Sequence, residues 1–547
     1  MNINQEFTRR FGLKVAGTIG AIAATGSLTS VAWAEPIGET ADAGEASVGG
    51  ELIVRTVELG DTMDPAKTGS AQVSSTLRLV GDTLIAKDYD GNFVPWIAES
   101  WDISEDGLTW TFKIREGVTF HDGTPLDATA VKFTFDRILD PATQAVTAAG
   151  LVGPMTSTEA PDATTFSFTL SEPFAPLLQF LTSSNLSIVS PTAVESMGDD
   201  FGRKPILSGA FMFDEWREGD RVVLKRNPDY AWAPEYMHQD PAGAFIETIT
   251  FQSITEDASA VAAFEAGEIQ QLSLPATDIS RFEGTEDYWI VTYERKGIIT
   301  LAFNVNVTPF DDPALRKVLM GAVNKDDVLD AAVEGYGFPA YSFLSPGIFG
   351  YWDGMKDYAP AYDPDGVIAA LAELGWTDTD GDGIVDKDGV KLSFTALNLP
   401  NDSYGRAAQI VQAQFSDVGV EMVIQQMEFA TVLEQVAAES HQAVFMGYTY
   451  QDPDIAYLIF DSSQAGAGIN LSAVRDPELD ALIKEGRSAT DPDARAAVYE
   501  TMQKYVNDQG LFVPLWYDSY YVAFQKSVRN ANFHPDSYTV YYDAFID

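Results

Sequence analysis

The stretch AESWDISEDGLTWTFKIREGVTFHDGTPLDATAVKFTFDR, residues 98–137, carries much of the information about the fold. Within it, Trp110, Phe112 and Ile114 alternate with polar neighbours. This two-residue period is typical of a strand that buries one face and exposes the other. The dipeptide that ends in Gly117 then supplies a turn. The stretch therefore predicts a β-strand that leads into a tight turn.

The same alternation recurs at residues 164–173 and, more weakly, at residues 220–230. The region from residue 50 to residue 300 is therefore predicted to be rich in strands. Beyond it, helical spacing appears in four segments, at residues 311–325, 363–376, 404–419 and 490–506. Strand patterns follow the last two, at residues 420–427 and 511–517.

This alternation of helices and strands in the second half predicts α/β lobes with mostly parallel sheets. With 547 residues the chain is too long for a single core, and two or three domains are expected. No linker separates the β-rich first half from the second half. We therefore expect lobes between which the chain crosses more than once.

The charge balance of the chain is strongly acidic. It has 34 Lys and Arg residues against 81 Asp and Glu residues, which gives a net charge of −47. Such a surface repels phosphate backbones and excludes nucleic acid as a partner. The chain has no cysteine, which excludes disulfides, thiolate metal sites and an N-terminal lipid anchor.

The N-terminus has the pattern of an export signal. Arg9 and Arg10 precede a short apolar run, residues 15–28, and Ala32-Trp33-Ala34 forms an A-x-A cleavage site. Residues 1–34 are therefore predicted to be a signal peptide of the twin-arginine kind, although export by the general route stays open. Residues 35–49 are small, polar and acidic, and are predicted to be a disordered leader of a periplasmic protein.

The sequence has none of the common catalytic motifs. It lacks G-x-S-x-G, G-x-x-x-x-G-K-[ST] and H-E-x-x-H, and its four histidines are scattered, at His121, His238, His441 and His534. This favours a binding protein that is not an enzyme. The alternative is an exported hydrolase that uses two of the many carboxylates, and product formation would distinguish the two.

The acidic stretch DTDGDGIVDKDG, residues 378–389, partly matches a calcium loop. The predicted ligands are Asp378, Asp380, Asp382, the carbonyl of Ile384, and Asp386. Gly389 stands where such a loop has its bidentate Glu, and a strand pattern follows in place of a helix. The alternatives are a structural calcium, a plain connector between a helix and a strand, and a calcium-dependent adhesin.

Residues 98–137 also resemble the signature of the extracellular solute-binding proteins that serve peptide, opine and nickel ABC transporters. The matching features are Ala98-Glu99-Ser100-Trp101, Asp106-Gly107, Arg115, Gly117-Val118 and the run from Phe120 to Pro125. Further similar segments follow in order at residues 208–233, 264–272, 301–329 and 487–516. The resemblance therefore spans nearly the whole chain after the signal.

The resemblance implies an α/β, two-lobe periplasmic-binding-protein fold of type II, with a β-rich subdomain inserted in lobe one. Lobe one would comprise residues 50–80, 206–301 and 514–547, the insert residues 81–205, and lobe two residues 302–513. The implied function is to capture a small polar organic solute, peptide-like, opine-like or sugar-like, by lobe closure. The protein would act as a monomer, need no cofactor, and deliver the solute to the transmembrane permease.

The resemblance also implies which residues contact the solute. They are Gly69, Ser70, Gln72, Tyr341, Tyr448, Thr449, Tyr450, Gln451 and Asp452. In peptide-binding members, an acidic residue three positions before an Asp-Pro pair holds the peptide amino group. Here the pair is Asp452-Pro453 and the earlier position is Thr449, which argues against peptides unless Asp452 or Asp454 substitutes. Nickel is disfavoured because these segments contain no histidine.

Overall fold

The computed structural model describes residues 47–237, 244–466 and 469–547. Contacts divide the chain into Met1–Trp33 and Ala34–Asp547, and the second unit is described below. The predicted signal peptide and the predicted leader up to residue 46 lie outside the described residues, as does His238. Among the described residues, no helix combines the length and apolar character that a membrane crossing requires.

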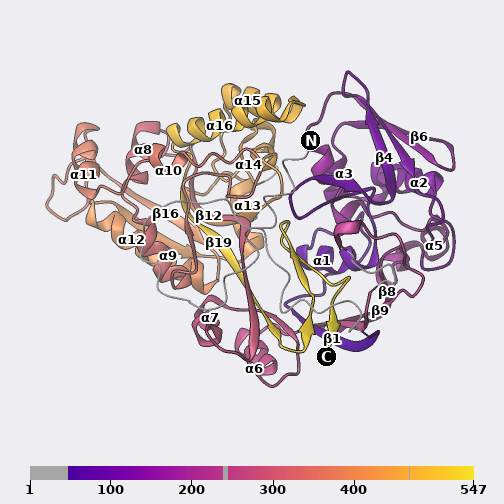
Figure 1. The fold of residues 1–547 in the computed structure, drawn as a ribbon. Helices are drawn as coiled ribbons and strands as arrows, with labels where there is room; N and C mark the ends of the chain where they lie inside the picture. The colour runs from indigo at the N-terminus through magenta and orange to yellow at the C-terminus, as the bar shows by residue number, and fades with distance from the viewer. Residues whose placement is uncertain (1–46, 238–243, 467–468) are drawn as a thin grey trace, which may run out of the picture. The chain divides into compact units, whose positions relative to one another are not determined.

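One mixed sheet of eleven strands runs through residues 49–525 (Figure 1). Its order is β17-β16-β18-β12-β19-β11-β1-β10-β9-β8, and β13 pairs with β19. The strands are β1 (Gly49–Thr56), β8 (Phe211–Arg217), β9 (Arg221–Arg226), β10 (Ile246–Ser253), β11 (Gln271–Ser273), β12 (Tyr288–Phe303), β13 (Gly337–Pro339), β16 (Ser393–Asn398), β17 (Glu421–Gln426), β18 (Ala443–Thr449) and β19 (Phe512–Gln525).

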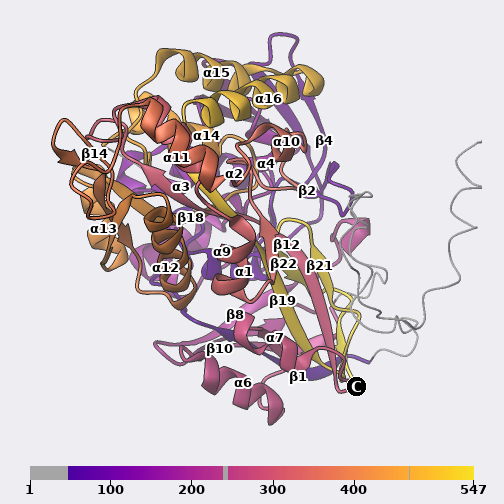
Figure 2. The ribbon, with the colours of Figure 1, turned by 90° about the vertical axis from the view of Figure 1, so that its left-hand side faces the viewer.

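The centre of this sheet is the antiparallel pair β12 and β19, the two longest strands, which lie side by side in both views (Figures 1 and 2). Their register runs from Tyr288 opposite Gln525 to Ala302 opposite Phe512, and it shifts at a bulge between Glu294 and Ile298. On one side β19 pairs with β11, and on the other β12 pairs with β18. The two strands thus join the first and second halves of the chain.

The expectation of mostly parallel sheets is wrong for the second half. Within the described part of the second half, only β16 with β17 and β16 with β18 pair in parallel. β12 runs antiparallel to both β18 and β19, and β13 runs antiparallel to β19. The reason is that a parallel ladder needs a crossover connection, whereas long strands that enter from the first half and leave toward the C-terminus can run against their neighbours.

Residues 98–170 form a separate antiparallel sheet of order β4-β5-β7-β6. Its strands are β4 (Ala98–Ile103), β5 (Thr109–Ile114), β6 (Met155–Asp162) and β7 (Thr165–Leu170). The predicted alternation is confirmed, because Trp110, Phe112 and Ile114 are buried. Helix α2 (Ala128–Leu139) covers this face, and the ring centre of its Phe135 lies 5.3 Å from that of Phe166.

The four predicted helices of the second half are confirmed as α8 (Pro313–Met320), α11 (Pro364–Glu373), α12 (Asp402–Asp417) and α16 (Pro492–Asp508). Three of them begin with an Asp-Pro pair whose aspartate caps the first turn, at Asp312, Asp363 and Asp491. The other helices there are α9 (Lys325–Val333), α10 (Met355–Tyr358), α13 (Phe429–Ala437), α14 (Ile455–Phe460) and α15 (Pro477–Ser488).

The remaining elements are short or lie in the first half and at the C-terminus. The helices are α1 (Ala71–Val80), α3 (Val146–Val152), α4 (Leu177–Phe180), α5 (Pro191–Met197), α6 (Asp257–Glu265) and α7 (Ala276–Phe282). The strands are β2 (Ile85–Lys87), β3 (Phe93–Pro95), β14 (Asp386–Lys387), β15 (Val390–Lys391), β20 (Val528–Arg529), β21 (Asn532–His534), β22 (Tyr538–Val540) and β23 (Phe545–Ile546).

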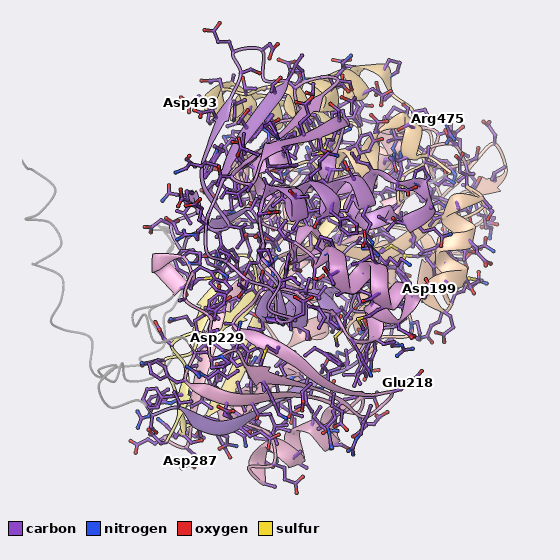
Figure 3. All side chains as sticks on the ribbon, turned by 90° about the vertical axis from the view of Figure 1, so that its right-hand side faces the viewer. Asp199, Glu218, Asp229, Asp287, Arg475 and Asp493 are labelled. Carbon is purple, nitrogen blue, oxygen red and sulfur yellow. The ribbon has the colours of Figure 1, made fainter. Side chains whose placement is uncertain are left out.

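The acidic excess lies on the surface of this unit. Figure 3 labels five exposed acids from different parts of the chain, Asp199, Glu218, Asp229, Asp287 and Asp493, and one exposed base, Arg475. Exposed charges of this kind are screened by salt within about 10 Å at 0.1 M ionic strength, so they tune solubility more than stability.

Gly209 sits where the chain returns from the inserted sheet to the large sheet. Its N–H donates to the Val80 carbonyl at 2.8 Å, and its own carbonyl accepts from His121 and Asn227. A Cβ built on Gly209 would lie 2.4 Å from the carbonyl carbon of Val80, which is backbone and cannot swing aside. The joint therefore requires glycine.

We expect Gly209→Ala to lower the free energy of unfolding by about 1 to 3 kcal/mol, because the added methyl overpacks a backbone contact. Gly150→Ala is the matched control, since a Cβ at Gly150 in α3 meets nothing within 4 Å and alanine favours a helix. Thermal and denaturant unfolding of both variants would check this. Equal stability of the two variants would contradict it.

Candidate functional site

A cavity of about 450 Å³ lies between residues 87–179 and residues 349–495, and we call it cavity A. One wall comes from residues predicted to form the insert, the other from residues predicted to form lobe two. It is lined by Lys87, Gly91, Phe93, Ile103, Ser104, Glu105, Asp106, Gly107, Trp110, Pro173, Phe174, Ala175, Leu178, Gln179, Phe349, Gln451, Asp452, Ser488, Ala489, Thr490, Pro492 and Arg495. A ligand there would touch both walls at once.

The loop after β18 contributes to one wall of cavity A and contains three of the predicted residues, Tyr450, Gln451 and Asp452. The Tyr450 N–H donates to the Lys296 carbonyl at 3.1 Å, which ties the loop to β12. The Tyr450 ring meets Phe180 edge-on, with ring centres 6.0 Å apart. Tyr450 packs against the hydrophobic cores on both sides of cavity A, so it spans the contact between them.

Asp452 is committed to a buried ion pair. Its two carboxylate oxygens accept from the Arg495 guanidinium of α16 at 2.6 and 3.2 Å, and one of them also accepts from the Asp454 N–H at 2.9 Å. The side chains of Asp452 and Arg495 are 5% and 9% exposed. A ligand ammonium could take Asp452 only by leaving a buried guanidinium unpaired, which is costly.

Asp454 forms a second buried pair, with Arg487 of α15. Asp454 Oδ1 and Arg487 Nε lie 2.9 Å apart but lack hydrogen-bond geometry. Burial raises the pKa of the Asp454 carboxyl to about 7, against the opposing charge of Arg487. The Arg487 guanidinium also lies 3.9 Å from the centre of the Tyr457 ring and 5.1 Å from that of Phe174. Thus neither Asp452 nor Asp454 offers a free carboxylate.

Gln451 has one buried polar atom without a partner among the described residues. Its side-chain amide donates to the Asp536 carbonyl at 3.2 Å, whereas its Oε1 accepts no hydrogen bond. Buried polar atoms of this kind usually have a partner, and an orphan acceptor beside a cavity marks a place for a donor from a ligand or water.

Beside cavity A, two lysines converge on one carboxylate. Asp536 Oδ1 lies 2.8 Å from Lys296 Nζ and 3.3 Å from Lys87 Nζ, and Asp536 Oδ2 accepts from Gln179 at 3.2 Å. The side chains of Lys296 and Asp536 are 4% and 3% exposed. Burial opposes ionisation of Asp536, but Lys296 and Lys87 hold its pKa well below the usual range.

His534 completes this cluster as a neutral ring. Burial lowers the His534 pKa to about 4. Its Nδ1 accepts from the Asp536 N–H at 3.0 Å, so the proton sits on Nε2, which lies 2.7 Å from the Lys87 carbonyl. The imidazole ring of His534 is therefore bonded to the backbone of both Lys87 and Asp536, and it fixes the positions from which these two charged side chains extend.

The remaining predicted residues of lobe two lie around β18 and β13 and do not line cavity A. The Tyr448 hydroxyl donates to the Phe343 carbonyl at 2.8 Å, and Thr449 is exposed at the end of β18. The Tyr341 N–H donates to the Tyr517 hydroxyl at 3.2 Å, and Lys325 Nζ lies 4.4 Å from the centre of the Tyr341 ring.

The predicted residues near α1 face other hollows. Gln72 lines a second cavity of about 310 Å³, cavity B, whose wall includes Tyr293 of β12, Tyr520 of β19 and Tyr538 of the C-terminal segment. Ser70 caps α1, donates to Glu58 and borders a separate surface pocket. Gly69 is exposed in the loop before it. The nine predicted residues are thus divided among several places.

Four residues of the cluster at cavity A were not predicted from the sequence: Lys87, Gln179, Lys296 and Asp536. Lys87 and Asp536 are 449 positions apart. Nothing in the local pattern around either residue marks it, because the contact arises only when the C-terminal segment folds back. The one available signal for this cluster was Lys296, a lysine within the strand β12 that the structure buries.

The acidic turn brings three of the five predicted calcium ligands together. Oxygens of Asp378, Asp380 and Asp382 lie within 4.8 Å of one another, and all three residues are exposed. Lys391 Nζ pairs with Asp382 and lies 3.4 Å from Asp380, so the positive charge beside these two carboxylates is the Lys391 ammonium group. The Asp386 carboxylate accepts from Thr379 instead, and the Ile384 N–H donates to Asp382 at 3.0 Å.

Comparison with known proteins gives consistent matches over most of the chain. A model of the bacterial extracellular solute-binding proteins, family 5 middle region, matches residues 92–468. The oligopeptide-binding protein AppA of Bacillus subtilis (strain 168) is 28% identical over 511 residues, which cover 90% of this chain and 91% of AppA. The dipeptide-binding protein of Escherichia coli (strain K12) is 28% identical over 465 residues, covering 80% and 83%.

Solved structures agree with these matches. NikA from Brucella suis in complex with Fe(III)-EDTA superposes with a TM-score of 0.81 at 25% identity, covering 91% of this chain and 100% of NikA. AppA from Bacillus subtilis in complex with a nonapeptide superposes with a TM-score of 0.73 at 26% identity, covering 90% and 97%. The predicted α/β, two-lobe fold is confirmed by these neighbours.

The raised pKa of Asp454 predicts a pH dependence of stability with a definite sign. The folded protein holds this proton up to a pH of about 7, whereas the ordinary value is 3.8. The stabilisation is therefore complete below the unfolded value and is lost as the pH rises toward 7. Relative to Asp454→Asn, the wild type should lose on the order of a few kcal/mol of unfolding free energy between about pH 4 and about pH 8.

Unfolding of the wild type and Asp454→Asn across this pH range would measure the difference. Asp287→Asn, which changes an exposed acid, is the control and should leave the pH profile unchanged. A relative stability that stays flat, or that rises with pH, would show that Asp454 is ionised in the folded protein.

Proposed function

Because the chain belongs to the bacterial extracellular solute-binding proteins of family 5, the substrate-binding components of ABC importers, we propose that it captures a small polar organic solute in cavity A. It is not an enzyme. A single observation carries this assignment of the site, namely that cavity A is walled by residues 87–179 on one side and residues 349–495 on the other.

This placement couples binding to closure. A ligand that contacts both walls gains contacts only when the walls are together, so it stabilises the closed form by its differential affinity. The contact of Tyr450 with Phe180 already joins the loop after β18 to residues predicted to form the insert. The closed form would then present the solute to the transmembrane permease, with no bond made or broken.

The solute class is constrained by what the loop after β18 lacks. Relatives are described as binding oligopeptides and dipeptides. Here Thr449 is not acidic, and the nearby Asp452 and Asp454 are both paired with arginines. A buried ammonium without a free carboxylate is costly. We therefore favour solutes whose nitrogen carries no positive charge, such as N-acylated amino acids, over peptides with a free amino terminus.

Thermal unfolding of the protein against peptides, N-substituted amino acids, opines and sugars tests this function. A solute at a hundred times its dissociation constant should add about 2.7 kcal/mol, which raises Tm by about 2 to 3 °C for a chain of this size. The same solutes, recovered and analysed by mass spectrometry after long incubation, should be unchanged. Turnover of any of them would contradict a binding protein.

Export and assembly belong to the same proposal. The pattern at residues 8–34 supports twin-arginine export to the periplasm and cleavage before Glu35, and we propose that the mature protein acts as a monomer. Expression in cells that lack the twin-arginine translocase should trap the precursor, whereas Arg9→Lys together with Arg10→Lys should do so in normal cells. Export that is unaffected in both cases would point to the general route.

Calcium at the acidic turn stays a prediction, and the structure specifies how to test it. Lys391 neutralises Asp380 and Asp382, so calcium must first displace its ammonium group. We expect weak calcium binding in the wild type and tighter binding in Lys391→Met, measured by titration calorimetry. Asp380→Ala should abolish the heat in both backgrounds. Equal affinity with and without Lys391 would mean that calcium does not use this turn.

A further inference from the structure

We infer that cavity A is built for an organic anion, a solute with a carboxylate on an apolar body, and that Lys87 is the residue that binds the carboxylate. The inference deepens the proposed function and rests on it. It is carried by three observations: a surplus of buried positive charge, an ammonium group with an unused proton, and an apolar remainder of the cavity wall.

The charge surplus follows from the pairs already described. Asp452 balances Arg495 on the cavity wall, and Arg487, which lies against Asp454, does not line cavity A. Asp536 alone faces both Lys87 and Lys296, which leaves one positive charge without a counterion among the described residues. The acids on the opposite rim, Glu105 and Asp106, are exposed, and Asp106 is bonded to Ser104 and to the Leu108 N–H.

An unbalanced charge in such a place is unfavourable. Burial lowers the pKa of Lys296, although Asp536 opposes this shift and Lys87 adds to it. Taking an ion out of water without a counterion is costly, and a second anion beside Lys87 reduces that cost. A ligand carboxylate in cavity A would supply this anion.

Lys87 is the member of the cluster that reaches the cavity. Its ammonium group donates to Gln179 Oε1 at 2.8 Å and to Asp536 at 3.3 Å. An ammonium has three N–H groups, and no acceptor for the third is found among the described residues. Gln451 Oε1, also on the cavity wall, is the orphan acceptor. The unused N–H of Lys87 and the unused Oε1 of Gln451 together match a ligand carboxylate that has an N–H or O–H donor next to it.

The rest of the wall is apolar. Phe93, Trp110, Phe174 and Leu178 come from one side of cavity A and Phe349 from the other. Such a lining takes up an aliphatic or aromatic group, and the few polar groups set its orientation. The matching solute is therefore an N-acylated amino acid with a hydrophobic side chain, or another carboxylate of similar shape.

The test uses N-acetyl-phenylalanine and its primary amide, which differ at the end that Lys87 would hold. Titration calorimetry of the full mature protein should show the acid binding about tenfold or more tightly than the amide. Lys87→Gln should remove this preference, and Lys87→Arg should keep it. Lys225→Gln, which changes an exposed lysine paired with Asp214, should leave it unchanged.

The outcomes distinguish a wrong anion assignment from a wrong solute-binding function. If the acid and the amide bind equally, or if Lys87→Gln keeps the preference, the anion assignment is wrong and the solute-binding function stands. If neither probe binds at millimolar concentration while sugars or free peptides raise Tm, the anion assignment is again overturned. If no organic solute binds at all, the proposed function falls with it. Thermal unfolding of Lys87→Gln confirms that any loss is not loss of fold.

Discussion

The antiparallel pairing of β12 with β19 is the constraint on which the rest of the molecule depends. These two strands carry the sheet from the first half of the chain into the second, and β11, β13 and β18 each pair directly with one of them. Their buried residues contribute to the cores on both sides. Without this pair, the walls of cavity A would have no common frame.

The bulge in β12 connects this frame to the chemistry of the site. Between Glu294 and Ile298 the register of the pair shifts, and Lys296 falls within that shift. A bulge re-aims the side chains of the bulged strand. Lys296 thereby reaches Asp536, whose own position depends on His534 and on the return of the C-terminal segment. The charge cluster is thus a product of three distant parts of the chain.

The sequence predicted the elements better than their arrangement. Alternation at Trp110, Phe112 and Ile114 and the Asp-Pro starts of three helices are local signals, and the structure confirms them. Strand direction is not local, so the mixed ladders of β12 and β19 were missed. The pairing of side chains at the candidate site is not local either, since the bonds of Asp452 to Arg495 and of Asp386 to Thr379 are not encoded by a motif.

A lysine at a bulge also gives the central pair of strands a mechanical property. Asp536 belongs to the C-terminal segment and to neither strand, so the Lys296–Asp536 ion pair fastens the bulge of β12 to a third part of the chain. Both side chains are buried, and separating them would leave two unpaired charges in a weakly polarisable interior, which is costly. The central pair of strands is therefore anchored by charge as well as by its backbone ladder.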